Sequence, residues 1–210
     1  MAYSVKEMFK TLQGEGGQAG RVAVFCRFAG CNLWSGREED RAAAICDFCD
    51  TDFVGTDGGG GGKFADAQAL ARRLAETWGE GREGRCVVFT GGEPLLQLDP
   101  ALIAAAHDEG FFVAVESNGT LAPPPGVDWL CVSPKAGADL RARRGQELKL
   151  VFPQPGLDPR EFEALEFERF FIQPMDGPGR ARATEAAIAF CLAHPRWRLS
   201  LQTHKLIGIP

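Results

Sequence analysis

The sequence lacks a long hydrophobic run and an excess of positive charge. Across 210 residues no stretch approaches the ~20 consecutive apolar residues of a membrane-spanning helix, and the first residues, MAYSVKEMFK, contain no signal-peptide core. The 23 Lys and Arg residues are outnumbered by 28 Asp and Glu, which gives a net charge of -5. Because nucleic acids and anionic membranes bind clustered Lys and Arg, neither is an expected partner. We therefore expect a cytoplasmic protein that binds a small molecule.

The chain has enough apolar sequence for one sizeable core. With 45% hydrophobic residues in 210, we expect a single domain over residues 1–210. Short runs of apolar, β-branched residues predict buried strands at 22–28, 86–90, 111–116, 129–133, 148–152, 169–173 and 198–203. Helical stretches are predicted at 64–78, 99–110, 158–167 and 182–194.

The alternation of strands and helices predicts a mainly parallel sheet of the α/β class. Residues 117–128 and 134–147 show no convincing helix, and a complete eightfold barrel typically needs ~250 residues. We therefore predict a partial, incomplete parallel β/α barrel with about six strands and few helices; a doubly wound sheet is the alternative. In both folds the binding site lies at the carboxyl ends of the strands.

Five consecutive glycines occupy positions 58–62. A phosphate-binding loop would need a Lys and then a Ser or Thr directly after its glycines, and here Lys63 is followed by Phe64. We therefore expect a flexible glycine-rich loop over residues 57–63.

Polar clusters follow four of the predicted strands: TGGEP at 90–94, ESNG at 116–119, SPK at 133–135 and QPMDG at 173–177. Each cluster alone is ordinary turn sequence, but the carboxyl ends of parallel strands meet at one edge of a sheet. Gly92 lets a ligand approach the backbone, and Ser133 with Lys135 suits a carboxylate. Glu116 suits an ammonium group or ribose hydroxyls. Together the clusters predict a site for a zwitterionic ligand.

The seven cysteines divide by their surroundings. Four lie in apolar runs and are expected in the core: Cys26, Cys86, Cys131 and Cys191. The other three lie in loop-like sequence and are candidate metal ligands: Cys31, Cys46 and Cys49. In the fourteen-residue gap after Cys31, Ser35 and Glu38 have the spacing of a capping box. A short helix there would return Cys46 to the neighbourhood of Cys31.

Three cysteines leave two alternatives for a metal. Zinc would need a fourth ligand, and the candidates are water or one of His107, His194, His204, Asp47 and Asp50. A [4Fe-4S] cluster would bind three cysteines and keep one iron open for a ligand. The spacing of the cysteines alone leaves both possibilities open.

The cluster loop at 31–49, together with GGEP, ESNG and SPK, resembles the radical S-adenosylmethionine superfamily. The usual motif of that superfamily is C-x3-C-x2-C, whereas this chain has C-x14-C-x2-C. A closer resemblance, to the 7-carboxy-7-deazaguanine synthase family, extends over nearly the whole chain. It is carried by FKTLQGEG, FCRFAGCNLWS, CDFCDT, TGGEP, VSPK and QTHKLIGIP.

The resemblance implies a carbon-nitrogen lyase of queuosine biosynthesis. A reduced [4Fe-4S] cluster on the three loop cysteines would split S-adenosylmethionine and generate a 5'-deoxyadenosyl radical. The radical would take hydrogen from 6-carboxy-5,6,7,8-tetrahydropterin, which loses ammonia and becomes 7-carboxy-7-deazaguanine. Other implied participants are Mg2+, an external one-electron donor such as a flavodoxin, and a second copy of the chain in a homodimer.

The resemblance also implies residue roles. The residues implied for S-adenosylmethionine are Phe48, Gly92, Glu116, Asn118, Ser133, Pro134, Lys135, Gln173, Pro174, Met175 and Asp176. Those implied for the pterin are Leu12, Gln13, Gly14, Glu15, Arg27, Thr90 and Pro210, and Thr51 is the implied Mg2+ ligand. An inward Arg27 needs an anion, either the substrate carboxylate or Glu15. The apolar segment before Pro210 is expected to dock and bring the Pro210 carboxylate to the pterin.

Two other functions compete with this one. A glycyl-radical activase shares the GGEP sequence and acts on a protein. A zinc-stabilised binding module would use the same cysteines without catalysis.

Overall fold

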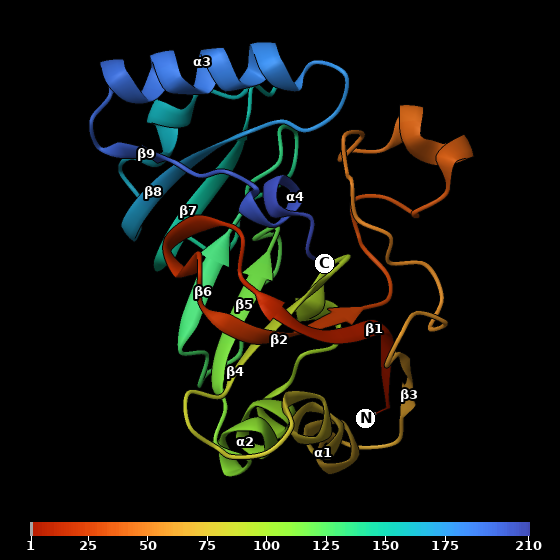
Figure 1. Cartoon of the computed structure of the whole chain (residues 1–210). Helices are drawn as coiled ribbons and strands as arrows, with labels where there is room; N and C mark the ends of the chain where they lie inside the picture. Colours follow the sequence, from red (N-terminus) through yellow and green to blue (C-terminus); the bar gives the residue numbers. More distant parts are fainter. Residues whose placement is uncertain (1) are drawn as a thin grey trace.

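The computed structural model describes residues 2–210 of the chain. Met1, the first residue of the expected domain, lies outside the described residues. These residues form one nine-stranded sheet in the order β3-β1-β2-β4-β5-β6-β7-β8-β9 (Figure 1). All strand pairs along the series β2-β4-β5-β6-β7-β8-β9 are parallel, and β1 is antiparallel to both β2 and β3. The strands are Tyr3–Leu12 (β1), Val22–Phe28 (β2), Gly62–Phe64 (β3), Cys86–Gly91 (β4), Phe112–Ser117 (β5), Trp129–Val132 (β6), Arg144–Phe152 (β7), Glu166–Pro174 (β8) and Trp197–Leu199 (β9).

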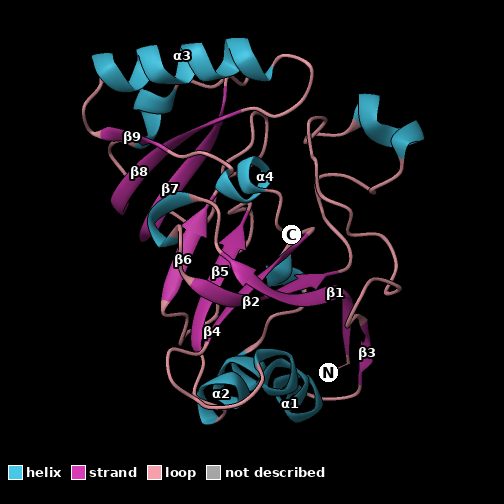
Figure 2. Ribbon diagram, in the orientation of Figure 1, coloured by secondary structure: helices cyan, strands magenta, loops and turns pink. Residues whose placement is uncertain are grey.

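The longer helices lie on the outer side of the curved sheet (Figure 2). They are Ala67–Trp78 (α1), Pro100–Asp108 (α2) and Arg180–Ala193 (α3), whereas the short Thr203–Ile207 (α4) lies in front of the carboxyl ends of the strands. Two different strands, β3 and β9, form the edges, so the sheet is not closed. The predicted partial barrel is confirmed, with nine strands in place of about six. Among residues 2–210, none of the helices is long and apolar enough to cross a membrane.

Local sequence explains where α1 and α2 begin. Asp66 and Asp99 are the N-cap residues, and their side chains accept hydrogen bonds from the amides of Ala69 (2.7 Å) and Leu102 (2.9 Å). Such caps satisfy amides that have no partner inside the helix.

The outer face of the sheet is apolar, whereas its inner face carries polar side chains and a second, smaller apolar cluster. In β7, Leu148 and Leu150 are fully buried in the main core, while Glu147 and Lys149 point to the inside of the barrel. Side chains alternate because successive residues of a strand face opposite sides of the sheet. The same alternation places polar residues of β2, β4 and β5 on the inner face, which therefore becomes the site.

Several expected elements differ in the structure. The strand β1 was not predicted because its charged residues alternate with buried Tyr3, Val5 and Met8, so it does not form a continuous apolar run. The helix expected at 158–167 is wrong: a short 3-10 turn, Pro159–Phe162, leads into β8. The strand expected at 198–203 is also wrong beyond Leu199, because α4 begins at Thr203.

The glycine run lies close against β1. The amide of Gly58 donates to the Lys6 carbonyl (2.9 Å), and the Met8 amide donates to the Gly59 carbonyl (2.8 Å). A Cβ atom added at Gly61 would lie 2.2 Å from the Lys6 carbonyl oxygen. Glycine is therefore needed here for close backbone approach, a steric role that the composition did not indicate.

Candidate active site

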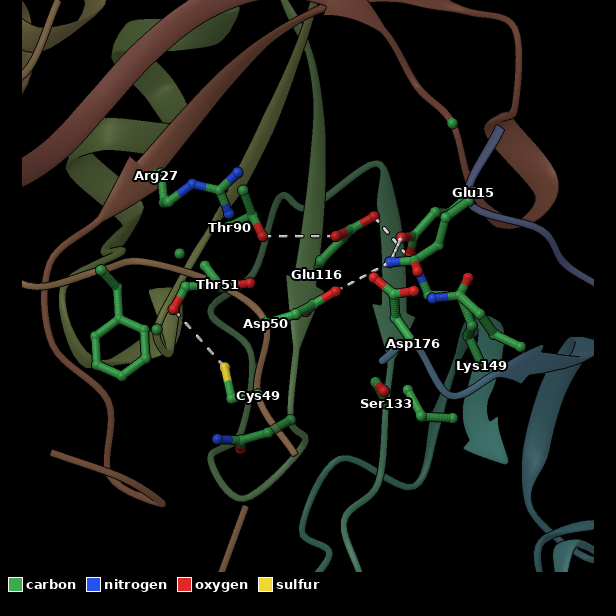
Figure 3. A pocket seen from close by; sticks show the side chains of 18 of the residues that line it. Glu15, Arg27, Cys49, Asp50, Thr51, Thr90, Glu116, Ser133, Lys149 and Asp176 are labelled. Carbon is green, nitrogen blue, oxygen red and sulfur yellow. Dashed lines mark hydrogen bonds and ion pairs between the residues drawn. The ribbon is translucent and has the colours of Figure 1, made fainter. Parts of the chain in front are cut away.

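A pocket of about 420 Å³ opens at the carboxyl ends of the parallel strands. Its lining contains every site residue expected from the sequence except Pro134. The carbonyl of Pro134 instead accepts a hydrogen bond from the Gln154 side chain (3.3 Å). The segment after β1, the cysteine loop, the ends of the inner strands and α4 thus meet around one space (Figure 3).

The long gap between the first two loop cysteines folds back on itself. The amides of Ile45 and Cys46 both donate to the Leu33 carbonyl, at 3.2 and 3.4 Å, which returns Cys46 to the start of the loop. The turn between them is a 3-10 helix, Glu38–Ala43. The expected capping box is wrong, because Arg37 is the N-cap residue and the Ser35 hydroxyl instead donates to Asp40 (2.6 Å).

The three loop thiols differ in their electrostatic surroundings. A hydrogen bond between Cys46 and Cys49 raises the pKa of Cys46 and lowers the pKa of Cys49 to about 6. Burial raises the pKa of Cys31, whose sulfur accepts a hydrogen bond from the Leu33 amide (3.5 Å). Cys49 therefore has the most thiolate character, and thiolates are the form that binds metal.

Gly92 lies directly against the cysteine loop. A Cβ atom at this position would be 2.0 Å from the Gly30 carbonyl oxygen and 2.9 Å from Cβ of Cys31. Only glycine fits here, so the backbone of the GGEP turn lines the pocket beside Cys31.

Glu93 of the same turn is fully buried and connects two strand ends. Its carboxylate accepts hydrogen bonds from the Ser117 hydroxyl (2.8 Å) and from the amides of Asn118 (2.7 Å) and Leu95 (3.0 Å). Burial raises its pKa. The Asn118 side chain then donates to Asn32 (2.9 Å), which links the ESNG turn to the cysteine loop. The sequence drew attention to GGEP but did not assign a separate role to Glu93.

Ser133 and Lys135 face each other. The Lys135 ammonium donates to the carbonyl (2.6 Å) and hydroxyl (2.8 Å) of Ser133, and burial lowers its pKa. Both line the pocket next to the loop cysteines.

The inner end of the pocket holds a buried charge network around Lys149, which the sequence analysis did not single out. Its ammonium lies 2.5 Å from a Glu15 oxygen and 3.5 Å from a Glu116 oxygen, and only 4% of the residue is exposed (Figure 3). Gln13 donates to Glu116 (2.9 Å) and Gln202 to Glu15 (3.0 Å). The only sequence signal was a lysine inside the apolar run LKLVF.

The pKa values of this network follow from its ion pairs. Burial raises the pKa of Glu15, but Lys149 together with hydrogen bonds from Gln202 and Gln173 outweighs that effect and holds it at about 2. Burial lowers the pKa of Lys149, and the carboxylates of Glu116 and Glu15 outweigh that effect and raise it well above the usual value. Glu15 and Lys149 are therefore both charged at neutral pH.

Arg27 pairs with a different carboxylate from the one expected. Its Nε donates to Glu7 (2.8 Å), which lies opposite it in the β1–β2 ladder. Of the two anions considered for Arg27, the alternative, Glu15, is excluded because Glu15 is bound to Lys149. Thr90 lies near by on β4, and its hydroxyl is 3.5 Å from Glu116.

The helix α4 lies between two sides of the pocket. Lys205 binds Asp50 of the cysteine loop (2.5 Å) and Asp176 after β8 (2.7 Å). The Thr203 hydroxyl donates to the Gly14 carbonyl (2.8 Å), and the Pro210 carbonyl accepts from Thr11 (2.8 Å). The sequence indicated this region through QTHKLIGIP but did not identify Lys205.

Comparisons with known proteins identify the family. No family model matches the chain. The 7-carboxy-7-deazaguanine synthase of Bordetella pertussis is 70% identical over 210 residues, and that of Caulobacter vibrioides is 65% identical over 210 residues; both alignments cover 100% of each chain. The chain belongs to the 7-carboxy-7-deazaguanine synthase family. The crystal structure of QueE from Escherichia coli is 27% identical with a TM-score of 0.72, and the match covers 96% of this chain and 94% of that one.

The three cysteines of this 7-carboxy-7-deazaguanine synthase family member are not gathered around a single ion. Within residues 2–210, no group of three or more His, Cys, Asp or Glu side chains could hold one metal ion. Zinc would need thiolates about 2.3 Å from the metal and hence close together. A [4Fe-4S] cluster binds each thiolate through a different iron, and three cysteines around one pocket fit that donor set.

Proposed function

We propose that the chain converts 6-carboxy-5,6,7,8-tetrahydropterin to 7-carboxy-7-deazaguanine with loss of ammonia. The proposal rests on one observation: residues that suit a cluster, a zwitterionic cofactor and a carboxylate substrate line the same pocket. The chain's membership in the 7-carboxy-7-deazaguanine synthase family supports this function over that of a glycyl-radical activase or a zinc-stabilised module.

Cys31, Cys46 and Cys49 would hold a [4Fe-4S] cluster. When bound, such a cluster supplies the electron that splits S-adenosylmethionine. The low pKa of Cys49 favours its thiolate, and the Leu33 amide donates to the sulfur of Cys31. Hydrogen bonds of this kind tune the potential of iron-sulfur sites.

S-adenosylmethionine would lie between the cysteine loop and the strand ends. The backbone beside Gly92 can accept from an amino group, and Lys135 with Ser133 can bind a carboxylate. Pro134 lies outside the pocket lining, so its contribution would be to orient its two neighbours. The remaining proposed contacts are Phe48, Glu116, Asn118, Gln173, Pro174, Met175 and Asp176.

The pterin would bind nearer to β1 and α4. The contact between Arg27 and Glu7 uses Nε, so that the terminal nitrogens can bind the substrate carboxylate. Glu15 would act by holding Lys149 and Gln202 in place. The remaining proposed contacts are Leu12, Gln13, Gly14, Thr90 and Pro210, with Thr51 as a Mg2+ ligand. A homodimer and an external donor such as a flavodoxin remain expectations from the resemblance, and a cytoplasmic location remains an expectation from the composition.

Cysteine variants test the proposal. Anaerobically reconstituted protein should contain iron and sulfide and form product from the pterin, S-adenosylmethionine and a reductant. Cys49→Ala should lose the cluster and the product, whereas Cys191→Ala, a half-buried cysteine of α3, should retain both. Equal product from Cys49→Ala and the wild type would contradict the assignment of the cluster site.

A further inference from the structure

The fourteen-residue gap in the cysteine motif carries an arginine that contacts the cluster loop at several points. Arg41 lies in the 3-10 helix Glu38–Ala43, and its guanidinium is stacked over the Trp34 ring at 4.1 Å from the ring centroid. Trp34 is itself buried and packs edge-on against Phe53, 5.5 Å away. The arginine therefore lies on a fixed aromatic surface.

The same guanidinium reaches the backbone of the C-x-x-C turn. Its Nη1 donates to the carbonyls of Asp47 (2.8 Å) and Cys49 (3.1 Å), while its Nε donates to Glu38 (2.8 Å). One side chain thus joins the inserted helix to the aromatic pair and to the carbonyls of Asp47 and Cys49. A planar, forked donor can make these contacts together, and a lysine ammonium is a single point charge that cannot.

We propose that Arg41 is a positioning residue for the cluster: it holds the Cys46–Cys49 turn in its binding geometry and places a positive charge beside the cluster. The inference rests on the proposed function. It also gives the long insertion a purpose, because a C-x3-C spacing has no room for such a helix and its arginine. Charge and hydrogen bonds near the sulfurs are among the determinants of cluster potential.

The insertion provides a matched control in Arg37. Its side chain is 72% exposed and its nearest acidic partner, Glu39, is 3.9 Å away. The contacts that Trp34 and Asp40 make with Arg37 use its backbone carbonyl, which Arg37→Ala keeps. Arg37→Ala and Arg41→Ala therefore remove the same charge from the same segment but only one of them removes the contacts.

The test measures iron loss to a chelator and the cluster midpoint potential in anaerobically loaded wild type, R37A, R41A and R41K. We expect R41A to lose iron about tenfold faster than wild type, because it lacks the charge-assisted hydrogen bonds. R37A should lose iron at the wild-type rate. R41K should also lose iron faster. The potential of R41A should be more negative than that of R37A. Equal rates or equal potentials for R41A and R37A, or full rescue by R41K, would overturn the proposal.

A second measurement separates this inference from the proposed function. In cluster-free protein, amide hydrogen exchange over residues 44–51 should be faster in R41A than in R37A and wild type, because R41A removes the hydrogen bonds to the Asp47 and Cys49 carbonyls. Unchanged exchange would contradict the positioning role. If wild type binds no iron at all, the proposed function fails, and the exchange measurement still tests Arg41.

Discussion

At the scale of single residues, the buried charges at the inner end of the pocket are the least predictable part of the molecule. A lysine within LKLVF indicates an unusual inward residue, but its partner Glu15 is 134 positions away along the chain. Local sequence cannot pair residues at that distance. Arg27 shows the same limit, because its inward direction was predicted correctly from the strand whereas its partner was not.

Replacing Lys149 by Met would leave the carboxylates of Glu15 and Glu116, whose side chains are only 14% and 25% exposed, without their cation. We expect a loss of about 3–5 kcal/mol in the free energy of unfolding at neutral pH, measured by urea denaturation. Lys63→Met, at an exposed position of β3, should change the stability little.

The pH dependence of stability should change with the same substitution. In the wild type the pKa of Glu15 is lowered from its usual 4.5 to about 2. The ionised carboxylate therefore stabilises the fold at pH values above 4.5, and this stabilisation is lost as the pH falls toward 2. In Lys149→Met, burial should raise the pKa of the unpaired Glu15 carboxyl, so stability should fall as the pH rises from about 4 to about 7. A variant whose stability stays level or rises over that range would contradict this account.

Glu93 allows a nearly isosteric test. In Glu93→Gln, an amide NH2 replaces an oxygen that accepts from the Ser117 hydroxyl or the Asn118 amide. We expect about 1–3 kcal/mol of lost stability because a buried donor loses its acceptor. Urea midpoints should show this loss, and the exposed control Glu80→Gln should show none.

At the scale of elements, the hydrophobic pattern identified the strands that are continuous apolar runs. Continuous apolar runs gave the inner parallel strands β2, β4, β5 and β6 nearly to the residue, because both faces of these strands are covered. Amphipathic β1 and the turn at Pro159–Phe162 were missed or misassigned, since tertiary pairing determines them more than local preference does.

The glycine run offers a test of element packing. Gly61→Ala should lower the free energy of unfolding by about 1–3 kcal/mol, because the new Cβ would meet the Lys6 carbonyl at 2.2 Å. Gly59→Ala is the matched control, since a Cβ there meets nothing within 4 Å. Thermal denaturation of both variants would decide, and equal melting temperatures would show that the run does not need glycine for close packing.

The helix α4 can be tested through Lys205. Lys205→Ala should weaken binding of the pterin about two- to fivefold, since two partly exposed ion pairs each contribute up to about 1 kcal/mol. The iron content should not change. Leu206→Ala, 63% exposed on the same helix, should bind as the wild type does in calorimetry. Equal affinities in the two variants would contradict a role for α4 in closing the pocket.

At the scale of the whole molecule, the open sheet brings cysteines, charged side chains and glycine backbone from separate segments around one pocket. The sequence predicted this arrangement because polar clusters follow successive strands and parallel strands share one carboxyl edge. It placed the carboxyl-terminal segment and the cysteine loop at that edge, but it did not predict the helix α4 or the contacts of the inserted 3-10 helix. Their positions depend on contacts such as Lys205 with Asp50 and Arg41 with Asp47, which join separate segments.

The most direct test of the central claim is the stoichiometry of one anaerobic reaction. Reduced, cluster-loaded protein is incubated with S-adenosylmethionine and 6-carboxy-5,6,7,8-tetrahydropterin, and product and ammonia are quantified together. We predict one ammonia released for each 7-carboxy-7-deazaguanine formed. Cleavage of S-adenosylmethionine with the pterin recovered unchanged would contradict the account.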